Sequence, residues 1–287
     1  MRVLITGAWG QLGQDLLRVY ADSQVLGLGS VEMDVTKADH TRRAIADWKP
    51  DVVFHCAAYT NVDGCEADPD RAFRVNALGA RNVALGCQAA GAAMVYVSTD
   101  YVFDGRRLGI PYTEYDAPNP LSVYGRSKLA GEECVRDLLD RFFIVRTSWL
   151  HGLHGKNFLR TILASARQGK ELAIVDDQVG SPTFTADLAQ ALRQLVETRQ
   201  YGVYHLTNAG SCSWYTFAKQ ALAVAAERFP ELAGTKVRPL TTEQLSRPAP
   251  RPAYSVLRNY NLELAGLPRP RPYEEALREF VQALDLE

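Results

Sequence analysis

The stretch RVLITGAWGQLG, residues 2–13, joins a strand to a helix through a glycine loop. Residues 2–6 form an apolar run that predicts a buried β-strand, and apolar side chains recur at helical spacing from Leu12 to Tyr20. Between the two lie three glycines, each three residues from the next: Gly7, Gly10 and Gly13. Glycines let the backbone turn tightly and approach a pyrophosphate, whose charge is stabilised by the free N–H groups of a helix N-terminus. The order strand, loop, helix therefore predicts a dinucleotide-binding site, and a glycine-rich turn without a ligand is the alternative.

Working outward from this stretch, short apolar runs alternate with longer helical patterns. Further strands are expected at residues 24–28, 52–56, 94–98 and 142–147, with helical stretches that include residues 70–90 and 127–139. Strands that are apolar throughout belong in a parallel sheet covered on both faces. The pattern predicts an α/β fold with a Rossmann-type, doubly wound parallel sheet.

The regular alternation loosens after Leu150, which suggests a second domain. We expect a dinucleotide-binding domain over residues 1–150 and a smaller, partly interleaved substrate-binding domain over residues 151–287, some of whose segments return to the first. Residues 236–273 hold seven of the fourteen prolines, so irregular structure is expected there.

The composition is that of a globular cytoplasmic protein. Of 287 residues, 47% are hydrophobic and 23% charged, and the net charge of −1 is less basic than a nucleic-acid binder would show. No signal peptide is visible and no apolar run reaches the roughly 18 residues of a membrane span. The five cysteines are widely spaced, which predicts reduced thiols. His151 and His154 lack a third ligand, so no metal site is predicted.

The charge balance changes sign near the C-terminus. Residues 236–273 contain seven Lys or Arg against two Asp or Glu, whereas residues 274–287 contain one Arg against five acids. One interpretation is an exposed basic surface followed by a solvated acidic helix. The other is an anion-binding site in the second domain, with Arg247 and Arg251 as candidates.

The choice between NADH and NADPH depends on the segment after the second strand. About 20 residues beyond the glycine loop, an acidic side chain would bind the adenosine ribose of NAD, but residues 27–30 read Gly-Leu-Gly-Ser. Glu32 and Asp34 come slightly later, and Asp34 and Val35 are expected to meet the adenine. Because no acid excludes the extra phosphate, NADPH is favoured, and use of NADH stays open.

Tyr124 and Lys128 are the candidate proton-transfer pair. They are four residues apart, which places them on one face of a helix, and an ammonium there would lower the pKa of the phenol toward working pH. Ser98, Thr99 and Asp100 end a predicted strand, where ligands bind in such sheets. A second pair with the same spacing, Tyr215 and Lys219, lies in a pattern typical of a packing helix, and we interpret it as structural.

Longer segments carry a resemblance to a known family. With the glycine loop and the tyrosine–lysine pair, the chain looks like an extended short-chain dehydrogenase/reductase, and it resembles the dTDP-4-dehydrorhamnose reductases most closely. The resemblance spans nearly the whole chain and is carried by residues 57–63, 98–105, 119–132, 146–149, 175–183, 204–207 and 247–252.

This resemblance implies the reduction of a nucleotide sugar, dTDP-4-dehydro-β-L-rhamnose, to dTDP-β-L-rhamnose for polysaccharide biosynthesis. Tyr124 would donate the proton, and Lys128 would bind the nicotinamide ribose. The cofactor would contact, besides these two, Gly7, Gly10, Gln11, Leu12, Gly13, Asp34, Val35, Ala57, Ala58 and Tyr59. The sugar would be held by Thr99, Asp100 and Trp149, and the diphosphate of the nucleotide by Arg247 and Arg251.

Several alternatives stay open beside this interpretation. Thr99 could simply cap a strand, and Trp149 could belong to an ordinary core. A nucleotide-sugar epimerase or dehydratase shares the same motifs, and the family also resembles the non-catalytic β subunit of methionine adenosyltransferase. Some members are described as magnesium-dependent dimers, but no magnesium ligands can be assigned in this chain, and a homodimer remains open.

Overall fold

A six-stranded parallel sheet forms the centre of the protein. The computed structural model describes residues 1–284, and within them the strand order is β10-β5-β4-β3-β1-β2. The strands are β1 (Arg2–Thr6), β2 (Gln24–Leu28), β3 (Val52–His55), β4 (Ala93–Thr99), β5 (Phe142–Thr147) and β10 (Gly202–His205). Every pair is parallel, which confirms the predicted Rossmann-type sheet. The order reverses between β1 and β3, and such a switch point is where these sheets bind ligands.

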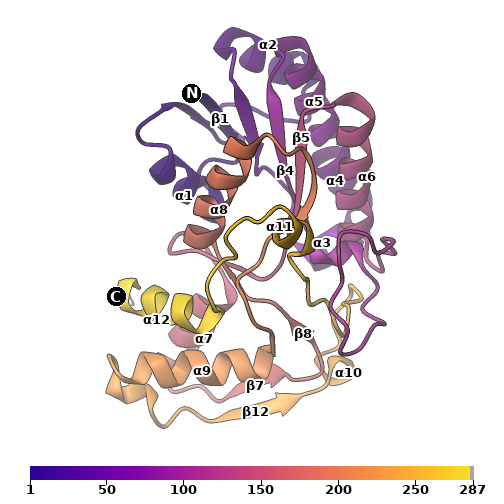
Figure 1. The fold of residues 1–287 in the computed structure, drawn as a ribbon. Helices are drawn as coiled ribbons and strands as arrows, with labels where there is room; N and C mark the ends of the chain where they lie inside the picture. Colours follow the sequence, from indigo (N-terminus) through magenta and orange to yellow (C-terminus); the bar gives the residue numbers. More distant parts are fainter. Residues whose placement is uncertain (285–287) are drawn as a thin grey trace.

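Helices cover both faces of the sheet (Figure 1). One face carries α1 (Gln11–Val19) and α8 (Thr185–Thr198), and the other carries α2 (Ala38–Trp48), α5 (Gly79–Ala90) and α6 (Val123–Leu138). The helical stretch predicted over residues 70–90 is three successive segments, α4 (Pro69–Phe73), the π-helix η1 (Arg74–Leu78) and α5, preceded by α3 (Val62–Ala67). Each face of the sheet is buried against its own apolar cluster, as the continuous apolar strands require.

The second half of the chain builds a separate core below the sheet in Figure 1. This core contains α7 (Phe158–Arg167), α9 (Trp214–Ala226) and α12 (Tyr273–Ala283). The shorter elements are β6 (Leu150–His151), β7 (Leu172–Val175), β8 (Val179–Gly180), β9 (Thr183–Phe184), β11 (Cys212–Ser213), β12 (Val237–Leu240), α10 (Thr242–Leu245), α11 (Tyr260–Leu264), η2 (Asp100–Val102) and η3 (Pro230–Leu232). Two segments from this half, α8 and β10, join the layers of the main sheet.

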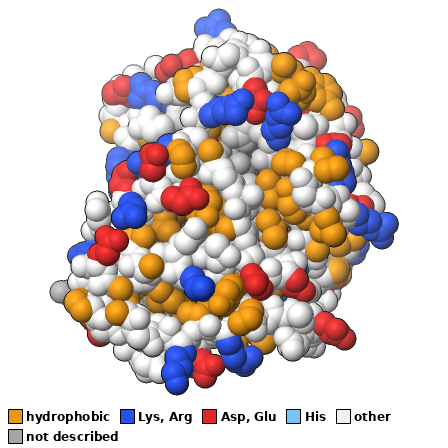
Figure 2. All heavy atoms as spheres, turned by 60° about the horizontal axis from the view of Figure 1, so that its bottom comes forward, with side chains coloured by type: hydrophobic (Ala, Val, Ile, Leu, Met, Phe, Trp, Pro, Cys, Tyr) orange, Lys and Arg blue, Asp and Glu red, His pale blue; other side chains and the backbone are white. Residues whose placement is uncertain are grey.

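The proline-rich segment 236–273 contains only short elements, as its composition predicts. The acidic segment after it is less exposed than a solvated helix, because α12 buries Leu277, Phe280 and Val281 in the second core. Residues 285–287 at its end lie outside the described part of the chain. Figure 2 shows acidic and basic side chains interspersed over one face, in keeping with the small net charge. Among residues 1–284, no helix is long and apolar enough to cross a membrane.

Candidate active site

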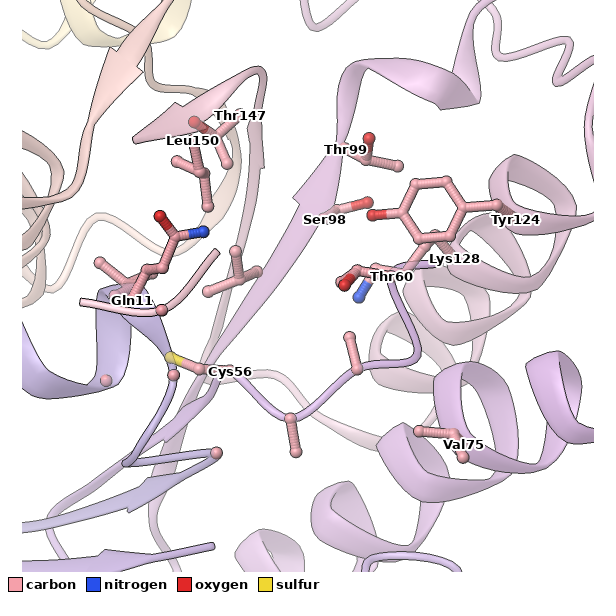
Figure 3. A pocket seen from close by; sticks show the side chains of 18 of the residues that line it. Gln11, Cys56, Thr60, Val75, Ser98, Thr99, Tyr124, Lys128, Thr147 and Leu150 are labelled. Atoms are coloured by element: carbon pink, nitrogen blue, oxygen red, sulfur yellow. The ribbon is translucent and has the colours of Figure 1, made fainter. Parts of the chain in front are cut away.

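A cavity of about 800 Å³ opens where β1, β3, β4 and β5 end. Both halves of the chain contribute to its lining, from the glycine loop to Trp214 on α9. Figure 3 shows Ser98, Thr99, Tyr124 and Lys128 together on one side of this pocket and Gln11 on the other. The structure therefore brings the predicted glycine loop and the predicted proton-transfer residues into one space.

The glycine loop is shaped for close backbone contact. Gly7 has a φ of +65°, and a Cβ atom there would lie 2.7 Å from the backbone nitrogen of Ala57. A Cβ on Gly13 would lie 2.5 Å from the carbonyl oxygen of Gly7. Gly10 precedes α1, and no acidic side chain occupies the first turn of that helix. The first-turn N–H groups of α1 therefore face the cavity without a competing negative charge, an arrangement that fits a diphosphate.

The predicted cofactor contacts divide into two groups. The cavity is lined by Gly7, Gly10, Gln11, Leu12, Gly13, Asp34, Val35, Ala57 and Ala58. Tyr59 is not among the lining residues, because its backbone N–H is held by Asn76 Oδ1 at 2.8 Å and the Arg71 guanidinium covers its ring. Asn76 also donates to the carbonyl oxygen of Tyr59, so the loop after β3 is fixed by a buried amide.

Tyr124 reaches the cavity from the first turn of α6. This helix begins four residues earlier than the predicted stretch 127–139, because the Ser122 hydroxyl accepts a hydrogen bond from the backbone N–H of Gly125 at 3.1 Å. The phenol of Tyr124 lies close enough to Thr99 for this side chain to affect its pKa, and the ring of Tyr101 packs edge-on against it with centroids 5.6 Å apart. The predicted meeting of Tyr124 with the end of β4 is thus present in the structure.

The electrostatics of this pair differ from the sequence-based expectation. Burial raises the pKa of Tyr124 above its ordinary value, and the neighbouring Thr99 side chain opposes this shift only in part. Lys128 is 2% exposed, and its ammonium lies 4.1 Å from the ring centroid of Tyr96. Burial lowers the pKa of Lys128 to about 7, and the charge of Glu132 acts in the opposite direction. Because burial makes the charged form of Lys128 unfavourable, Lys128 does not stabilise the phenolate of Tyr124, and Tyr124 stays protonated.

The side of the cavity formed by α6 and the end of β4, the α6 wall, is anchored by Glu132. Its carboxylate accepts two hydrogen bonds from the guanidinium of Arg146, at 2.9 and 2.7 Å, and one from the Ser98 hydroxyl at 2.6 Å. All three side chains are buried, and they join α6 to β5 and β4. Because the partners are fully desolvated and multiply hydrogen-bonded, this network holds α6 rigidly against the strand ends.

Thr99 and Asp100 form a compact polar corner at the end of β4. The Thr99 hydroxyl donates to Asp100 Oδ1 at 3.1 Å and accepts from the backbone N–H of Tyr101 at 3.2 Å. Thr99 therefore caps the 3-10 turn η2 as well as facing Tyr124. Asp100 is 2% exposed, and burial raises its pKa to about 6. Both side chains line the cavity.

Sequence reasoning named Gln11 and Trp149 but missed the contacts that build the far wall of the cavity. The side-chain oxygen of Gln11 accepts hydrogen bonds from the backbone N–H of Gly152 and from Asn157 Nδ2, each at 2.9 Å. These contacts bring the loop with Lys156 and Phe158 over the glycine loop, and both residues line the cavity. The contacts join positions more than 140 residues apart, so no local pattern announced them.

Two tryptophans complete the far wall. Trp149, with a φ of +46°, stacks on Trp214 with ring centroids 3.5 Å apart and planes inclined by 10°. Both rings line the cavity, so Trp149 lies where a sugar-binding residue was predicted. Trp214 begins the helix that was interpreted as purely structural, and that interpretation overlooked its first residue. Tyr215 and Lys219 of the same helix do not line the cavity.

Arg247 and Arg251 lie outside the cavity lining and are paired with Asp63. Arg251 makes three contacts of 3.1 Å with the carboxylate of Asp63, and Arg247 lies 3.6 Å from it. Arg251 also lies close enough to Tyr101, which does line the cavity, for its charge to lower the pKa of that phenol. The two arginines thus join the proline-rich segment to the start of α3. Their contact with a nucleotide diphosphate stays a prediction.

The structure offers no local metal centre in the part of the chain that it describes. Within residues 1–284, no group of three or more His, Cys, Asp and Glu side chains is placed to hold a metal ion. His151 is buried among aromatic rings, and burial lowers its pKa to about 3.

Comparisons with known proteins agree with this architecture. Residues 1–286 match the family described as RmlD substrate binding domain. The chain is 43% identical over 283 residues to the spore coat polysaccharide biosynthesis protein SpsK of Bacillus subtilis, covering 98% of this chain and 97% of that protein. It is 41% identical over 292 residues to the dTDP-4-dehydrorhamnose reductase of Mycolicibacterium smegmatis, covering 99% and 86%.

A solved structure gives the same result at the level of the fold. The dTDP-4-dehydrorhamnose reductase of Bacillus anthracis in complex with NADP superimposes with a TM-score of 0.93 at 41% identity, covering 97% of this chain and 98% of that one. The match extends over both halves of the molecule and thus over both walls of the cavity. The chain belongs to the dTDP-4-dehydrorhamnose reductase family, within the extended short-chain dehydrogenases/reductases.

Proposed function

We propose that this protein reduces the C4 ketone of dTDP-4-dehydro-β-L-rhamnose to give dTDP-β-L-rhamnose. The observation that carries the proposal is the position of Tyr124, beside Thr99 in the same cavity as a glycine loop shaped for a diphosphate. The family of the chain supports the choice of substrate. The reaction belongs to the biosynthesis of an activated sugar for polysaccharides.

Tyr124 acts as the proton donor in this proposal. Its raised pKa keeps the phenol protonated at neutral pH, so it holds the proton that the forming alkoxide requires. Thr99 shares the hydrogen bond to the sugar oxygen and keeps that oxygen beside the phenol. The reduced nicotinamide supplies the hydride when it is bound.

Lys128 positions the nicotinamide ribose and supports the return of a proton to Tyr124. Its pKa of about 7 lets the amine exchange protons near neutral pH, and the stacking of its ammonium on Tyr96 fixes its direction. The Glu132 network behind it prevents α6 from moving during the reaction.

The cofactor is NADPH in this proposal, with NADH as a second substrate. The structure fits a dinucleotide at the glycine loop, where a Cβ on Gly7 or Gly13 would collide with neighbouring backbone and so prevent the tight turn of the loop. Gln11 and Leu12 supply first-turn N–H groups, and the exposed ammonium of Lys156 lines the same part of the cavity. The solved relative from Bacillus anthracis, which is in complex with NADP, supports this assignment.

The sugar occupies the space between Tyr124 and the stacked pair Trp149 and Trp214. Flat indole faces favour the C–H face of a pyranose, and Asp100 offers an acceptor for a hydroxyl. We assign residues 1–150 to cofactor binding and residues 151–287 mainly to the substrate, with α8 and β10 as the segments that return to the first domain. Placement of the nucleotide diphosphate beside Arg247 and Arg251 belongs to the same proposal.

The test is a coupled measurement of cofactor and product. Purified protein is mixed with enzymatically made dTDP-4-dehydro-L-rhamnose and NADPH, and cofactor oxidation is compared with dTDP-rhamnose formed. Equal amounts of the two are expected. Product without net NADPH consumption, with cofactor that copurifies, would indicate an epimerase or dehydratase. Folded protein that oxidises neither NADPH nor NADH, with magnesium supplied, would indicate a regulatory subunit.

A cytoplasmic location and a homodimer remain predictions, and the homodimer is checked by light scattering.

A further inference from the structure

A carboxylate stands at the end of β2, where local sequence showed none. The chain after Leu28 turns back within four residues, and Glu32 Oε2 accepts a hydrogen bond from the backbone N–H of Gly29 at 2.8 Å. The indole N–H of Trp9 lies 3.4 Å from the same oxygen. The Glu32 carboxylate thus lies beside Gly29 and Ser30, the residues found at the distance from the glycine loop where a ribose-binding acid is expected.

Glu32 is not itself a lining residue of the cavity, but its carboxylate contacts two residues that are. Trp9, Gly29 and Ser30 all line the cavity, and two of them are its hydrogen-bond donors. The loop that carries Trp9 is held beside β2 by the backbone N–H of Ala8, which donates to the carbonyl oxygen of Leu28 at 3.2 Å. In a Rossmann-type sheet, the end of this strand is where the adenosine ribose lies when the diphosphate is at the glycine loop.

The other groups at this end do not compensate for the negative charge of Glu32. The residues that line it are Trp9, Gly29, Ser30, Met33, Asp34, Val35 and Thr36, with no lysine or arginine among them. Asp34 Oδ1 is engaged by Thr36, accepting from its N–H at 3.0 Å and its hydroxyl at 2.7 Å. Hydrogen bonds from its own backbone N–H and that of Gly29 lower the pKa of Glu32, so it is ionised at neutral pH.

We propose that Glu32 is the residue that sets the balance between NADH and NADPH. Its free carboxylate oxygen accepts a hydrogen bond from the 2′-hydroxyl of NADH, whereas the 2′-phosphate of NADPH meets a like charge. The enzyme then accepts NADH readily, although its family includes a structure with NADP. This inference rests on the proposed function, because it concerns the cofactor of that same reaction.

Glu32→Gln is the sharpest variant for a test. The amide keeps an oxygen that accepts from Gly29 and Trp9, so the loop retains its contacts while the charge is lost. Glu32 is exposed, so the variant is expected to fold. Asp39→Asn is the matched control, because it removes one exposed carboxylate from α2, where Asp39 forms an ion pair with Arg42.

The measurement is the ratio of kcat/KM for NADPH to kcat/KM for NADH. We expect E32Q to raise this ratio at least about tenfold, and D39N to leave it within about twofold, since like charges that meet in a site are costly while remote ones are screened. The E32Q effect shrinks as salt is added. An unchanged ratio in E32Q, or an equal rise in D39N, would overturn the assignment.

A binding assay separates this inference from the proposed reaction. Adenosine 2′,5′-bisphosphate and 5′-AMP carry the two forms of the ribose without a nicotinamide, and their affinities are measured by calorimetry. E32Q is expected to gain affinity for the bisphosphate and to lose or keep affinity for 5′-AMP. This result would support the role of Glu32 even if no sugar were reduced, and identical affinities in wild type and E32Q would contradict it.

Discussion

Two tyrosine–lysine pairs with the same spacing lie in different regions of this molecule. On α6, Tyr124 and Lys128 face the cavity at the end of the parallel sheet, and Lys128 is buried. On α9, Lys219 is exposed, and its ammonium lies 5.3 Å from the ring centroid of Tyr215. Only the first pair meets a hydroxyl from a strand end, Thr99, among the contacts in the described chain.

The difference shows that spacing places two side chains on one helix face, while their surroundings decide their chemistry. Burial shifts the pKa of Tyr124 upward and that of Lys128 down to about 7, whereas no such burial acts on the exposed Lys219. A matched set of substitutions in the two helices tests this conclusion directly.

The largest expected effect is the loss of the Tyr124 hydroxyl. Tyr124→Phe should lower kcat by about 10²- to 10⁴-fold, because the proton donor is gone while the ring still packs against Tyr101. Affinity for NADPH should change little. Tyr215→Phe is the control and should keep kcat within about twofold. Steady-state kinetics on both variants checks the prediction, and near-normal turnover of Y124F would break the comparison.

Removal of the ammonium should have the next largest effect. Lys128→Met should lower kcat/KM by about 10- to 100-fold and weaken cofactor binding, because the contact with the nicotinamide ribose is lost. The fold should persist, since Glu132 keeps Arg146 as its partner. Lys219→Met should leave both quantities unchanged. Equal losses in the two lysine variants would contradict a special role for α6.

A smaller effect on catalysis is expected from loss of the Asp63–Arg251 ion pair, which lies outside α6 and acts on Tyr124 through Tyr101. Asp63→Asn removes the counter-charge of Arg251, which holds Tyr101 against Tyr124. We expect KM for the sugar nucleotide to rise about three- to tenfold, with a smaller change in kcat. Asp22→Asn breaks a comparable exposed pair with Arg193 and serves as the control. An equal rise of KM in D22N would contradict a specific role of the Asp63–Arg251 pair.

Much of the α6 wall, and the glycine loop on the opposite side of the cavity, could be predicted, because both depend on local signals. Strand, glycine loop and helix follow one another in residues 2–19, and the end of β4 carries its hydroxyls in sequence. The direction of the Tyr124 pKa was predicted wrongly, since spacing gives the distance to Lys128 but not the burial of either group.

The contacts that build the far wall could not be predicted, for a different physical reason, although Gln11 and Trp149 themselves were named as candidates. The stacking of Trp149 on Trp214 and the contacts of Gln11 with Gly152 join segments that meet only after folding. Glu32 was named in the sequence but not placed at the end of β2, for the same reason on a shorter scale, because its loop turns back on β2.

The smallest expected effect concerns stability and its dependence on pH. Because burial raises the pKa of Asp100 to about 6, the folded protein binds a proton between roughly pH 4 and 6 that the unfolded chain has released. The free energy of unfolding therefore falls as pH rises through this window. Asp100→Asn should be more stable than wild type at pH 8, by an amount of order 3 kcal/mol, and the gain should vanish near pH 4.

Urea unfolding of wild type and D100N at several pH values measures this difference. The sugar-binding role proposed for Asp100 makes the variant less active even where it is more stable, which separates the two contributions. A stability difference that is independent of pH would show that Asp100 carries no buried charge beside Tyr124.

The most direct measurement of the central claim is the transfer of deuterium to the sugar. NADPH labelled with deuterium at C4 of the nicotinamide, on the transferred face, is incubated with dTDP-4-dehydro-L-rhamnose, and the product is examined by mass spectrometry and NMR. The account predicts one deuterium at C4 of dTDP-rhamnose for each cofactor oxidised, with the label almost absent from the product of Y124F at equal time. Product without deuterium at C4, or label that returns to the cofactor, would contradict it.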